Sequence, residues 1–279
     1  MKKLLLIVNP YSGQKKAAKL LPEIIAMFNR ADYTVQVYIT AGPGDATVEA
    51  ARVCRDVDLV VCCGGDGTFN ETLAGILESG LNTPIGYIPA GSTNDFASSL
   101  KLSSDILEAT QDIILGTPVA YDAGKFGERY FSYVASFGAF TRTSYATPQS
   151  IKNALGHTAY VLEGIQELSQ IRKEHIKMIN STSVGGILTL DPEVVDLQDN
   201  KLEILLVRAP KNLAEIHECI VALNTQKYNC AMLTFRSATH IRIFADPDMP
   251  WTLDGEREEG HSEVVVTPQH LAYRLMKRQ

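Results

Sequence analysis

The sequence predicts a chain in two parts, a doubly wound α/β half followed by a mainly antiparallel β half. Strand-like and helix-like segments alternate through about the first 120 of the 279 residues, which is typical of a parallel sheet covered by helices on both faces. After about Tyr121, short segments rich in β-branched and aromatic residues follow one another between turns, which favours an antiparallel sandwich with helical insertions. Because no Gly/Ser-rich linker separates the halves, we expect them to pack closely around a cleft.

The α/β half begins with a short, continuous apolar run at residues 4–8, which predicts a strand buried on both faces. Apolar residues at helical spacing then predict a helix between Leu20 and Phe28. The remaining expected elements of this half are strands at 35–39, 59–63 and 85–88 and helices at 47–55, 69–77 and 93–100.

The β half is expected to contain one long helix and several short strands. The helix is predicted at 159–172, where Leu162, Ile165 and Leu168 recur at three-residue spacing. The expected strands are 130–134, 185–190, 202–207, 232–235, 240–244 and 263–266.

Composition excludes several classes of protein. Hydrophobic residues make up 45% and charged residues 21%, as in ordinary globular domains and unlike disordered or coiled-coil chains. The net charge of −6 argues against a dedicated nucleic-acid binder. Five cysteines without a CxxC pair favour a reducing compartment, and six histidines without an HExxH motif predict no zinc site. The run at 4–8 is too short for a signal peptide, and no apolar stretch could span a membrane, so we expect a soluble protein.

The strongest chemical motif is Gly64-Gly65-Asp66-Gly67-Thr68, placed between a predicted strand and a predicted helix. Ligands of open α/β sheets bind at the carboxyl ends of strands, and amides at the start of a helix can hold phosphate oxygens. Glycines allow the backbone to approach such a ligand, while Asp66 could organise Mg²⁺ through water or orient a nucleophile. The alternative is a tight turn, for which fewer glycines would suffice.

Two more polar loops follow predicted strands at the same edge. Asn9-Pro10-Tyr11-Ser12-Gly13 follows the first strand and offers hydroxyl and amide donors, although it could be a routine loop. Residues 89–96 (PAGSTNDF) follow the fourth strand and could cap a helix or line a nucleotide pocket. Neither GxxxxGK[ST] nor GxGxxG occurs, which argues against a P-loop kinase and a dehydrogenase.

Three features of the remaining sequence leave alternatives open. Asp254-Gly255 predicts a turn that presents Glu256 either as a general base or as part of a solvated acidic hairpin. The acidic stretch at 191–200 could hold a hard cation, but it lacks the EF-hand pattern and could be a solvated loop. Basic residues at 172–173, at Lys177 and at 277–278 could contact anionic lipid head groups or form a solvated face.

The motifs at 64–71 (GGDGTFNE) and 89–97 (PAGSTNDFA) resemble those of the diacylglycerol kinase catalytic-domain family, and in particular its soluble bacterial lipid kinases. The resemblance covers essentially the whole chain. The loop at 9–13, Asp122-Ala123-Gly124, residues 155–160 and Asp254-Gly255-Glu256 also match. GGDGT alone would be shared with NAD kinases, so an NAD kinase-like small-molecule kinase is the alternative enzyme. A catalytically silent nucleotide-binding regulator is the alternative of another class.

The resemblance implies a Rossmann-like nucleotide-binding domain at 1–122 with a C-terminal return at 268–279, a β-sandwich substrate and metal domain at 123–267, and ATP in the cleft. It implies phosphoryl transfer from ATP to a lipid hydroxyl, most simply diacylglycerol to phosphatidic acid, with Glu256 as general base, Asp66 organising Mg²⁺ and Asp122 assisting. The implied contacts of ATP are Asn9, Ser12, Thr40, Gly64, Gly65, Asp66, Gly67, Thr68, Asn70 and Thr93.

The resemblance also implies a structural Mg²⁺ held by Asp196, Asp199 and the carbonyl of Lys201. Asn200 stands where the family has glycine, and asparagine tolerates the left-handed conformation that glycine would supply. The expected setting is cytoplasmic, with transient peripheral contact at the inner membrane face, no nucleic acid and no transmembrane segment. A homodimer is left open, and no motif identifies the particular lipid.

Overall fold

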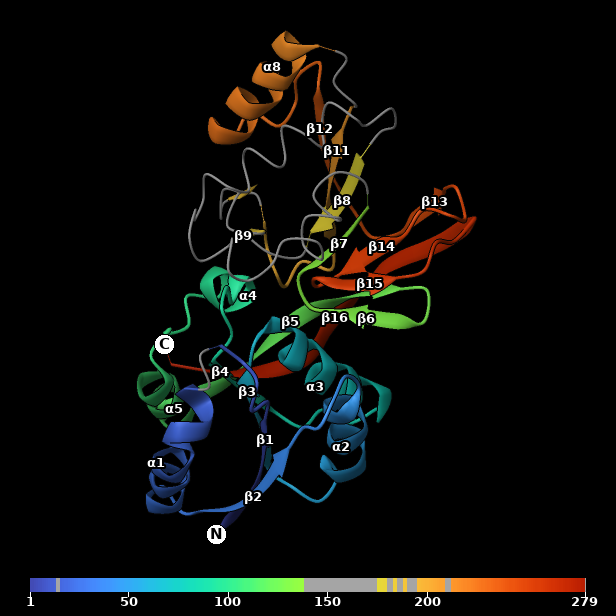
Figure 1. Ribbon diagram of the computed structural model, residues 1–279. Coiled ribbons are helices and arrows are strands. Elements are labelled where there is room, and N and C mark those ends of the chain that lie inside the picture. Colours follow the sequence, from blue (N-terminus) through green and yellow to red (C-terminus); the bar gives the residue numbers. More distant parts are fainter. Residues whose placement is uncertain are drawn as a thin grey trace. The chain divides into compact units, whose positions relative to one another are not determined.

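The computed structural model describes residues 1–13, 16–137, 175–179, 183–184, 188–189, 195–208 and 212–278 (Figure 1). Contacts divide the chain into two compact units. The first comprises Met1–Ala123, Gln198–Asn200 and Gln269–Gln279, and the second comprises Gly124–Leu197 and Lys201–Pro268. Two strands, β5 (Thr117–Phe126) and β16 (Glu263–Lys277), have residues in both units.

The first unit is built on a mainly parallel sheet. Its strands are β1 (Lys2–Val8), β2 (Tyr33–Ile39), β3 (Leu59–Gly64) and β4 (Ile85–Pro89), which lie in the order β2-β1-β3-β4 and are followed by β16 and β5. Strands β1 to β4 pair in parallel, and β16 joins β4 in the same direction. Because the chain moves outward to β2 and then returns to β3 on the other side of β1, the topological switch point lies between β1 and β3.

Helices cover both faces of this sheet. On one face, α1 (Lys16–Arg30) and α5 (Ile106–Leu115) contribute Phe28 and Ile113 to a buried core with Leu6 and Val61 of the strands. On the other, α2 (Asp45–Val53) packs on α3 (Asp66–Glu78) (Figure 1). Successive side chains of a strand point to opposite faces of the sheet. Both faces are buried here, so the runs in β1 and β3 are apolar at every position.

The predicted elements of this half are confirmed except at the fourth helix. There the structure has only a short helix, α4 (Asp95–Ser99), in place of the expected 93–100. It starts at Asp95 because Asn94 adopts a left-handed conformation with φ of 54° and exchanges hydrogen bonds of 3.0 Å with both backbone groups of Gly91. Helix α5 was not among the predicted elements.

The strands described in the second unit pair in antiparallel fashion. Six of them lie in the order β12-β11-β8-β7-β14-β15. Their bounds are β7 (Val134–Phe137), β8 (His175–Ile179), β11 (Leu202–Val207), β12 (Leu233–Ala238), β14 (Trp251–Leu253) and β15 (Glu256–Glu258). Further antiparallel pairs join β5 to β6 (Arg129–Phe131), β13 (Ile241–Phe244) to β16, and β9 (Ser183–Val184) to β10 (Leu188–Thr189).

One core serves the two main sets of strands in the second unit. It takes Phe126 and Phe131 from β5 and β6, and Phe137 and Trp251 from β7 and β14. Trp251 is fully buried, with aromatic neighbours at 4.8 Å and 4.6 Å between ring centroids. Helix α8 (Leu213–Asn224), which was not among the predicted elements, begins behind an Asn212 cap.

The prediction of a single strand at 130–134 is wrong, because the structure has two strands, β6 and β7, in this segment. The backbone N–H groups of Ser132 and Tyr133, between the strands, donate to the Asp254 carboxylate. The strand expected at 263–266 is the start of the much longer β16. The expected helix at 159–172 lies outside the described residues, as does part of the strand expected at 185–190. No helix in the described part of the chain is long and apolar enough to cross a bilayer.

Candidate functional site

Three polar loops meet at the carboxyl ends of β1, β3 and β4. The loop after β1 is tied to β3 through the backbone of Asn9, whose N–H donates to the carbonyl of Cys63 at 3.0 Å. The Asn9 side chain reaches further, and its Nδ2 donates to Oγ1 of Thr68 at 3.1 Å. The N–H of Ala90, after β4, donates to the carbonyl of Gly64 at 2.7 Å. The loops predicted from sequence therefore lie together at the switch point of the sheet, where open α/β sheets bind ligands.

Glycines allow these loops to approach one another. A Cβ added to Gly91 would lie 2.6 Å from Cα of Gly65, and one added to Gly64 would lie 2.6 Å from Cβ of Thr68. Gly13 has φ of 51°, and an added Cβ there would lie 2.5 Å from the carbonyl oxygen of Ala90. The glycines are therefore required by loop packing as well as by any approach of a ligand.

The N-terminus of α3 lies within this loop cluster. Its N-cap residue is Gly65, which has no side chain to accept hydrogen bonds from the first amides of the helix. Such amides, together with the helix dipole, favour a phosphate group. Asp66 opens the helix and is partly exposed, and its Oδ1 accepts a hydrogen bond of 3.0 Å from the hydroxyl of Tyr87. Asn70, one turn further on, is 3% exposed, and its buried Oδ1 has no hydrogen-bond partner among the described residues.

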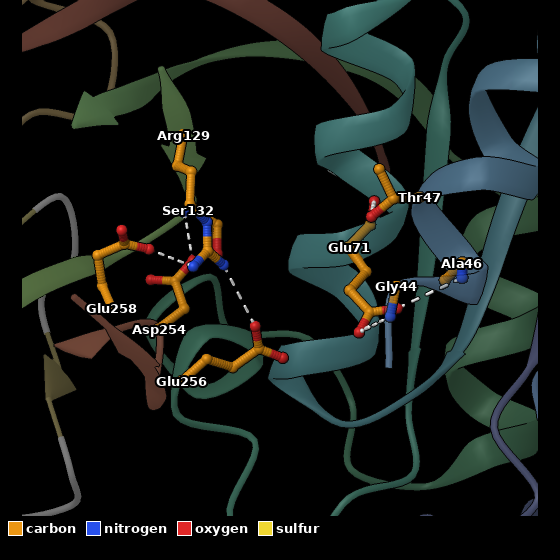
Figure 2. Close-up of polar contacts among 9 residues, drawn as sticks. All are labelled: Gly44, Ala46, Thr47, Glu71, Arg129, Ser132, Asp254, Glu256 and Glu258. Carbon is orange, nitrogen blue, oxygen red and sulfur yellow. Dashed lines mark hydrogen bonds and ion pairs between the residues drawn. The ribbon is translucent and has the colours of Figure 1, made fainter. Parts of the chain in front are cut away.

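Glu71 of α3 connects this cluster to the loop after β2 (Figure 2). Its carboxylate accepts from the N–H of Gly44 at 2.8 Å and of Ala46 at 3.3 Å, and so caps the N-terminus of α2. The hydroxyl of Thr47 donates to the carbonyl of Glu71 at 3.0 Å. Glu71 thus fixes the segment that follows Thr40, a buried residue whose N–H donates to the Val8 carbonyl at 3.0 Å.

The other sequence-predicted residues of this unit differ in their surroundings. Ser12 is almost buried beside Asn9, whereas Thr93 is exposed in the loop after β4. Asp122 is fully buried and is engaged with the backbone. Its Oδ2 accepts from the N–H of Asn200 at 2.6 Å, and its Oδ1 accepts from the N–H of Leu271 at 2.7 Å and lies 3.0 Å from Nδ1 of His270. Asp122 therefore holds two distant chain segments in place.

In the second unit, Glu256 begins β15 directly after a two-residue hairpin turn. Asp254 and Gly255 both have positive φ, 49° and 88°, as a type I′ turn requires. The Asp254 carboxylate accepts hydrogen bonds from the N–H groups of Ser132, Tyr133 and Val134 and from the Ser132 hydroxyl, at 2.5 to 3.0 Å. Burial raises the pKa of Asp254 against the opposing effect of these hydrogen bonds.

Arg129 orients the carboxylate of Glu256. Its Nη2 lies 3.5 Å from Oε2 of Glu256, and its Nη1 pairs with Glu258 (Figure 2). The Glu256 side chain remains 39% exposed. A fixed, accessible carboxylate beside a guanidinium can accept a proton from a hydroxyl group.

The expected Mg²⁺ loop shows one of its predicted features. Asn200 is left-handed, with φ of 60°, which confirms the prediction that asparagine supplies this conformation. Asp196 and Lys201 are exposed, and Asp199 is partly exposed. Among the described residues no group of three or more His, Cys, Asp or Glu side chains is placed to hold a metal. The expected set has only two such side chains, Asp196 and Asp199, together with a backbone carbonyl. The absence of a group of three in the described part of the chain therefore does not test it, and the Mg²⁺ site stays a prediction.

Several contributing residues were missed by the sequence argument. Glu71 is the last residue of the recognised GGDGTFNE segment, so its position could have suggested it. Tyr87 lies within a predicted strand, and Arg129 is 127 positions from Glu256, so no local pattern indicates either. All five cysteines are free, and Cys62 and Cys63 are fully buried, which confirms the prediction that they belong to the core.

Comparisons with known proteins agree with this arrangement. Residues 3–126 match the diacylglycerol kinase catalytic domain. The chain is 31% identical to a diacylglycerol kinase of Bacillus subtilis over 92% of its length and 90% of that protein. It is 32% identical to one of Staphylococcus haemolyticus over 90% of its length and 81% of that protein. A solved diacylglycerol kinase structure from Bacillus anthracis, with a TM-score of 0.80, 22% identity and coverage of 99% and 97%, shows the same fold.

These findings define the class of protein as an ATP-dependent lipid kinase. More particularly, the chain belongs to the diacylglycerol kinase family, which confirms the family indicated by its sequence motifs.

Proposed function

We propose that this lipid kinase transfers the γ-phosphate of ATP to the free hydroxyl of diacylglycerol and so forms phosphatidic acid. The observation that carries the proposal is the loop cluster at the switch point, where Asn9 contacts Thr68 beside the N-terminus of α3, which lacks a side-chain cap. The relatives named diacylglycerol kinases support the acceptor, since they align with this chain over at least nine tenths of its length.

ATP is proposed to bind with its phosphates at the Gly64–Thr68 loop. The amides at the start of α3 are suited to phosphate oxygens. The buried Oδ1 of Asn70, without a partner among the described residues, is an acceptor and can be satisfied only by an N–H or O–H donor. Asp66 fits the role of organising Mg²⁺, because it is a partly exposed carboxylate oriented by the Tyr87 hydroxyl. Mg²⁺, when bound, supplies positive charge that neutralises the phosphates during transfer.

Glu256 is proposed as the general base. Its carboxylate takes the proton of the lipid hydroxyl while the hydroxyl oxygen bonds to the γ-phosphorus and the bond to the departing ADP oxygen breaks. This step requires the carboxylate to come within about 3 Å of the hydroxyl. Arg129 supports the assignment, because its guanidinium pairs with the carboxylate and restricts its orientation.

The finer expectations belong to the same proposal. Two sets of strands sharing one core support a β-sandwich as the substrate and metal domain. The carboxylates of Asp196 and Asp199, close to the left-handed Asn200, are suitable donors for a second Mg²⁺ together with the Lys201 carbonyl. Asp122 contributes to catalysis by positioning. Contact with the membrane is transient and peripheral, at the cytoplasmic face.

The test offers labelled ATP with diacylglycerol in mixed micelles, and in a parallel reaction with NAD. Labelled phosphatidic acid is expected only in the first reaction, and product from NAD instead would overturn the lipid assignment. Glu256→Gln should lower the rate by about 10²–10⁴-fold. The matched control is Glu259→Gln, at an exposed neighbouring position, which should change it little. A Glu256→Gln rate within about tenfold of wild type would show that Glu256 is not the base.

Asp66→Ala should remove turnover while the protein stays folded. A circular dichroism spectrum like that of wild type establishes folding, and ATP binding is then measured by calorimetry with and without Mg²⁺. Turnover that persists in this variant would remove Asp66 from the mechanism.

A further inference from the structure

A small cavity in the first unit is lined by three cationic residues that the proposed reaction does not use. Lys101, Lys277 and Arg278 surround a volume of about 30 Å³, with Ser103 and Asp112 also in its lining. This volume holds roughly two water molecules, so it is large enough for small polar groups and too small for a ring system.

The charges in this cavity are balanced only in part by the protein. Arg278 has a partner, because its Nη1 lies 3.5 Å from Oδ1 of Asp112. The ammonium groups of Lys101 and Lys277 make no hydrogen bond or ion pair with any residue in the described ranges. Partial burial, and then the proximity of Lys101, lower the pKa of Lys277. Lys101 is exposed and Lys277 is partly exposed, so solvent screens part of their repulsion, and an anion bound between them would relieve the rest.

The backbone at Lys101 adds a second, independent observation. Lys101 follows α4 in the left-handed conformation, with φ of 57°. The N–H of Leu102 donates to the carbonyl of Ala97 at 2.9 Å, and that of Lys101 to Ser98 at 3.0 Å, which is the Schellman pattern. Glycine is the usual residue at this position because it adopts positive φ without steric cost. The chain therefore has a lysine at a position where the backbone conformation favours glycine, which has no side chain.

We propose that Lys101, Lys277 and Arg278 form a binding site for a phosphate-type oxyanion. Lysine and arginine groups bind such anions through charge-assisted hydrogen bonds, and the cavity has room for about two oxygens of a phosphate group. The anion is either inorganic phosphate or the phosphomonoester head group of a lipid. The three cations are not among the residues proposed for phosphoryl transfer, although Tyr87, whose hydroxyl donates to Asp66, also lines the cavity.

The reactivity of Lys277 provides a test that does not depend on kinase activity. The full-length protein is treated at pH 8 with an amine-acylating reagent, and the modification rate of each lysine is measured by peptide mass spectrometry. Because its pKa is lowered, Lys277 should react faster than an ordinary lysine at the same pH, and a bound anion should protect it. With a Kd of about 1 mM, 10 mM phosphate should lower its rate about tenfold relative to chloride at equal ionic strength. Exposed Lys227 serves as an internal reference whose rate should not change.

Two further comparisons identify the source of the anion. Vesicles of phosphatidylcholine containing phosphatidic acid are compared with pure phosphatidylcholine vesicles. Protection by free phosphate supports the site with a soluble anion, and protection by the phosphatidic acid vesicles alone supports it with a lipid head group. Unchanged reactivity of Lys277 under all of these conditions overturns the proposal.

Lys101→Gly removes one cation while favouring the backbone conformation already present. Its urea midpoint should be equal to or higher than that of wild type, so loss of the site cannot be ascribed to unfolding. Phosphate should then protect Lys277 much less, by about twofold at most if the Kd rises about tenfold. Lys19→Gln, at another exposed position, is the matched control for loss of a charge. Full protection of Lys277 in the Lys101→Gly variant would refute the proposal.

Discussion

Replacing Asp254 by alanine tests whether one buried carboxylate organises the hairpin that carries Glu256. Asp254 is 4% exposed and accepts four hydrogen bonds, three from consecutive backbone N–H groups at 132–134 and one from the Ser132 hydroxyl. Its own N–H donates to the Val134 carbonyl at 2.8 Å. Alanine keeps this last contact and removes every acceptor.

The expected loss of stability follows from these contacts. A buried N–H without a partner costs about 1–3 kcal/mol, and water entering the vacated space reduces that cost, so about 1 kcal/mol for each of three amides is a reasonable value. Alanine at φ of 49° adds about 1 kcal/mol. The second unit should therefore lose about 4 kcal/mol of unfolding free energy. Asp254→Asn, which retains one acceptor oxygen and tolerates positive φ, should lose less.

The assay uses the only tryptophan in the chain. Trp251 is fully buried in the core of the second unit, so its fluorescence during a urea titration reports the unfolding of that unit. Asp248→Ala, at an exposed position of the same unit, is the control and should change stability by no more than about 0.5 kcal/mol. A loss below about 1 kcal/mol for Asp254→Ala would refute the argument, because the amides would then have found other partners.

Three further predictions concern the first unit. Gly91→Ala places a Cβ 2.6 Å from Cα of Gly65, which should cost about 1–3 kcal/mol of strain. The Kd for ATP, measured by calorimetry, should therefore rise about tenfold or more. An unchanged Kd would show that the loops can separate without consequence. Glu71→Gln should cost roughly 1 kcal/mol in thermal unfolding, because the cap of α2 loses its charge, while Glu78→Gln should not. Burial raises the pKa of Cys63 to about 12, so only about one thiol in 10⁴ is ionised at pH 8. Iodoacetamide should therefore label Cys63 only after unfolding. Rapid labelling of the native protein would contradict the burial of this thiol.

Elements defined by contiguous sequence could be predicted well. Strands β1 and β3 contain uninterrupted apolar runs, at 4–8 and 59–63, and the GGDGT loop follows from its place between such a run and a helix. Helix α5 was missed although its sequence contains the evidence. The Asp105 side chain accepts from two amides of the first turn, and Ile106, Ala109 and Ile113 recur at helical spacing. The cap at Asp105 and this spacing together indicate a helix that begins at Ile106.

Contacts between distant segments could not be predicted from local patterns. The break between β6 and β7 depends on an acceptor that lies 120 to 122 residues further along the chain. Asp122 binds amides 78 and 149 residues away. In each case the local sequence around the donors is compatible with a continuous strand or a simple loop. Only the folded chain shows which carboxylate these amides contact.

Burial distinguishes the roles of three aspartates that occur in similar sequence motifs. Asp66, Asp122 and Asp254 each stand within two residues of a glycine in a motif that resembles the kinase family, and sequence alone would allow any of them to contact ATP or a metal. Asp122 and Asp254 are buried, and their oxygens accept from backbone amides that would otherwise lack partners, so replacing either should disturb the fold before it affects chemistry. Asp66 is partly exposed at the start of a helix. For that reason loss of turnover with a retained fold is expected of Asp66→Ala and not of substitutions at the other two positions.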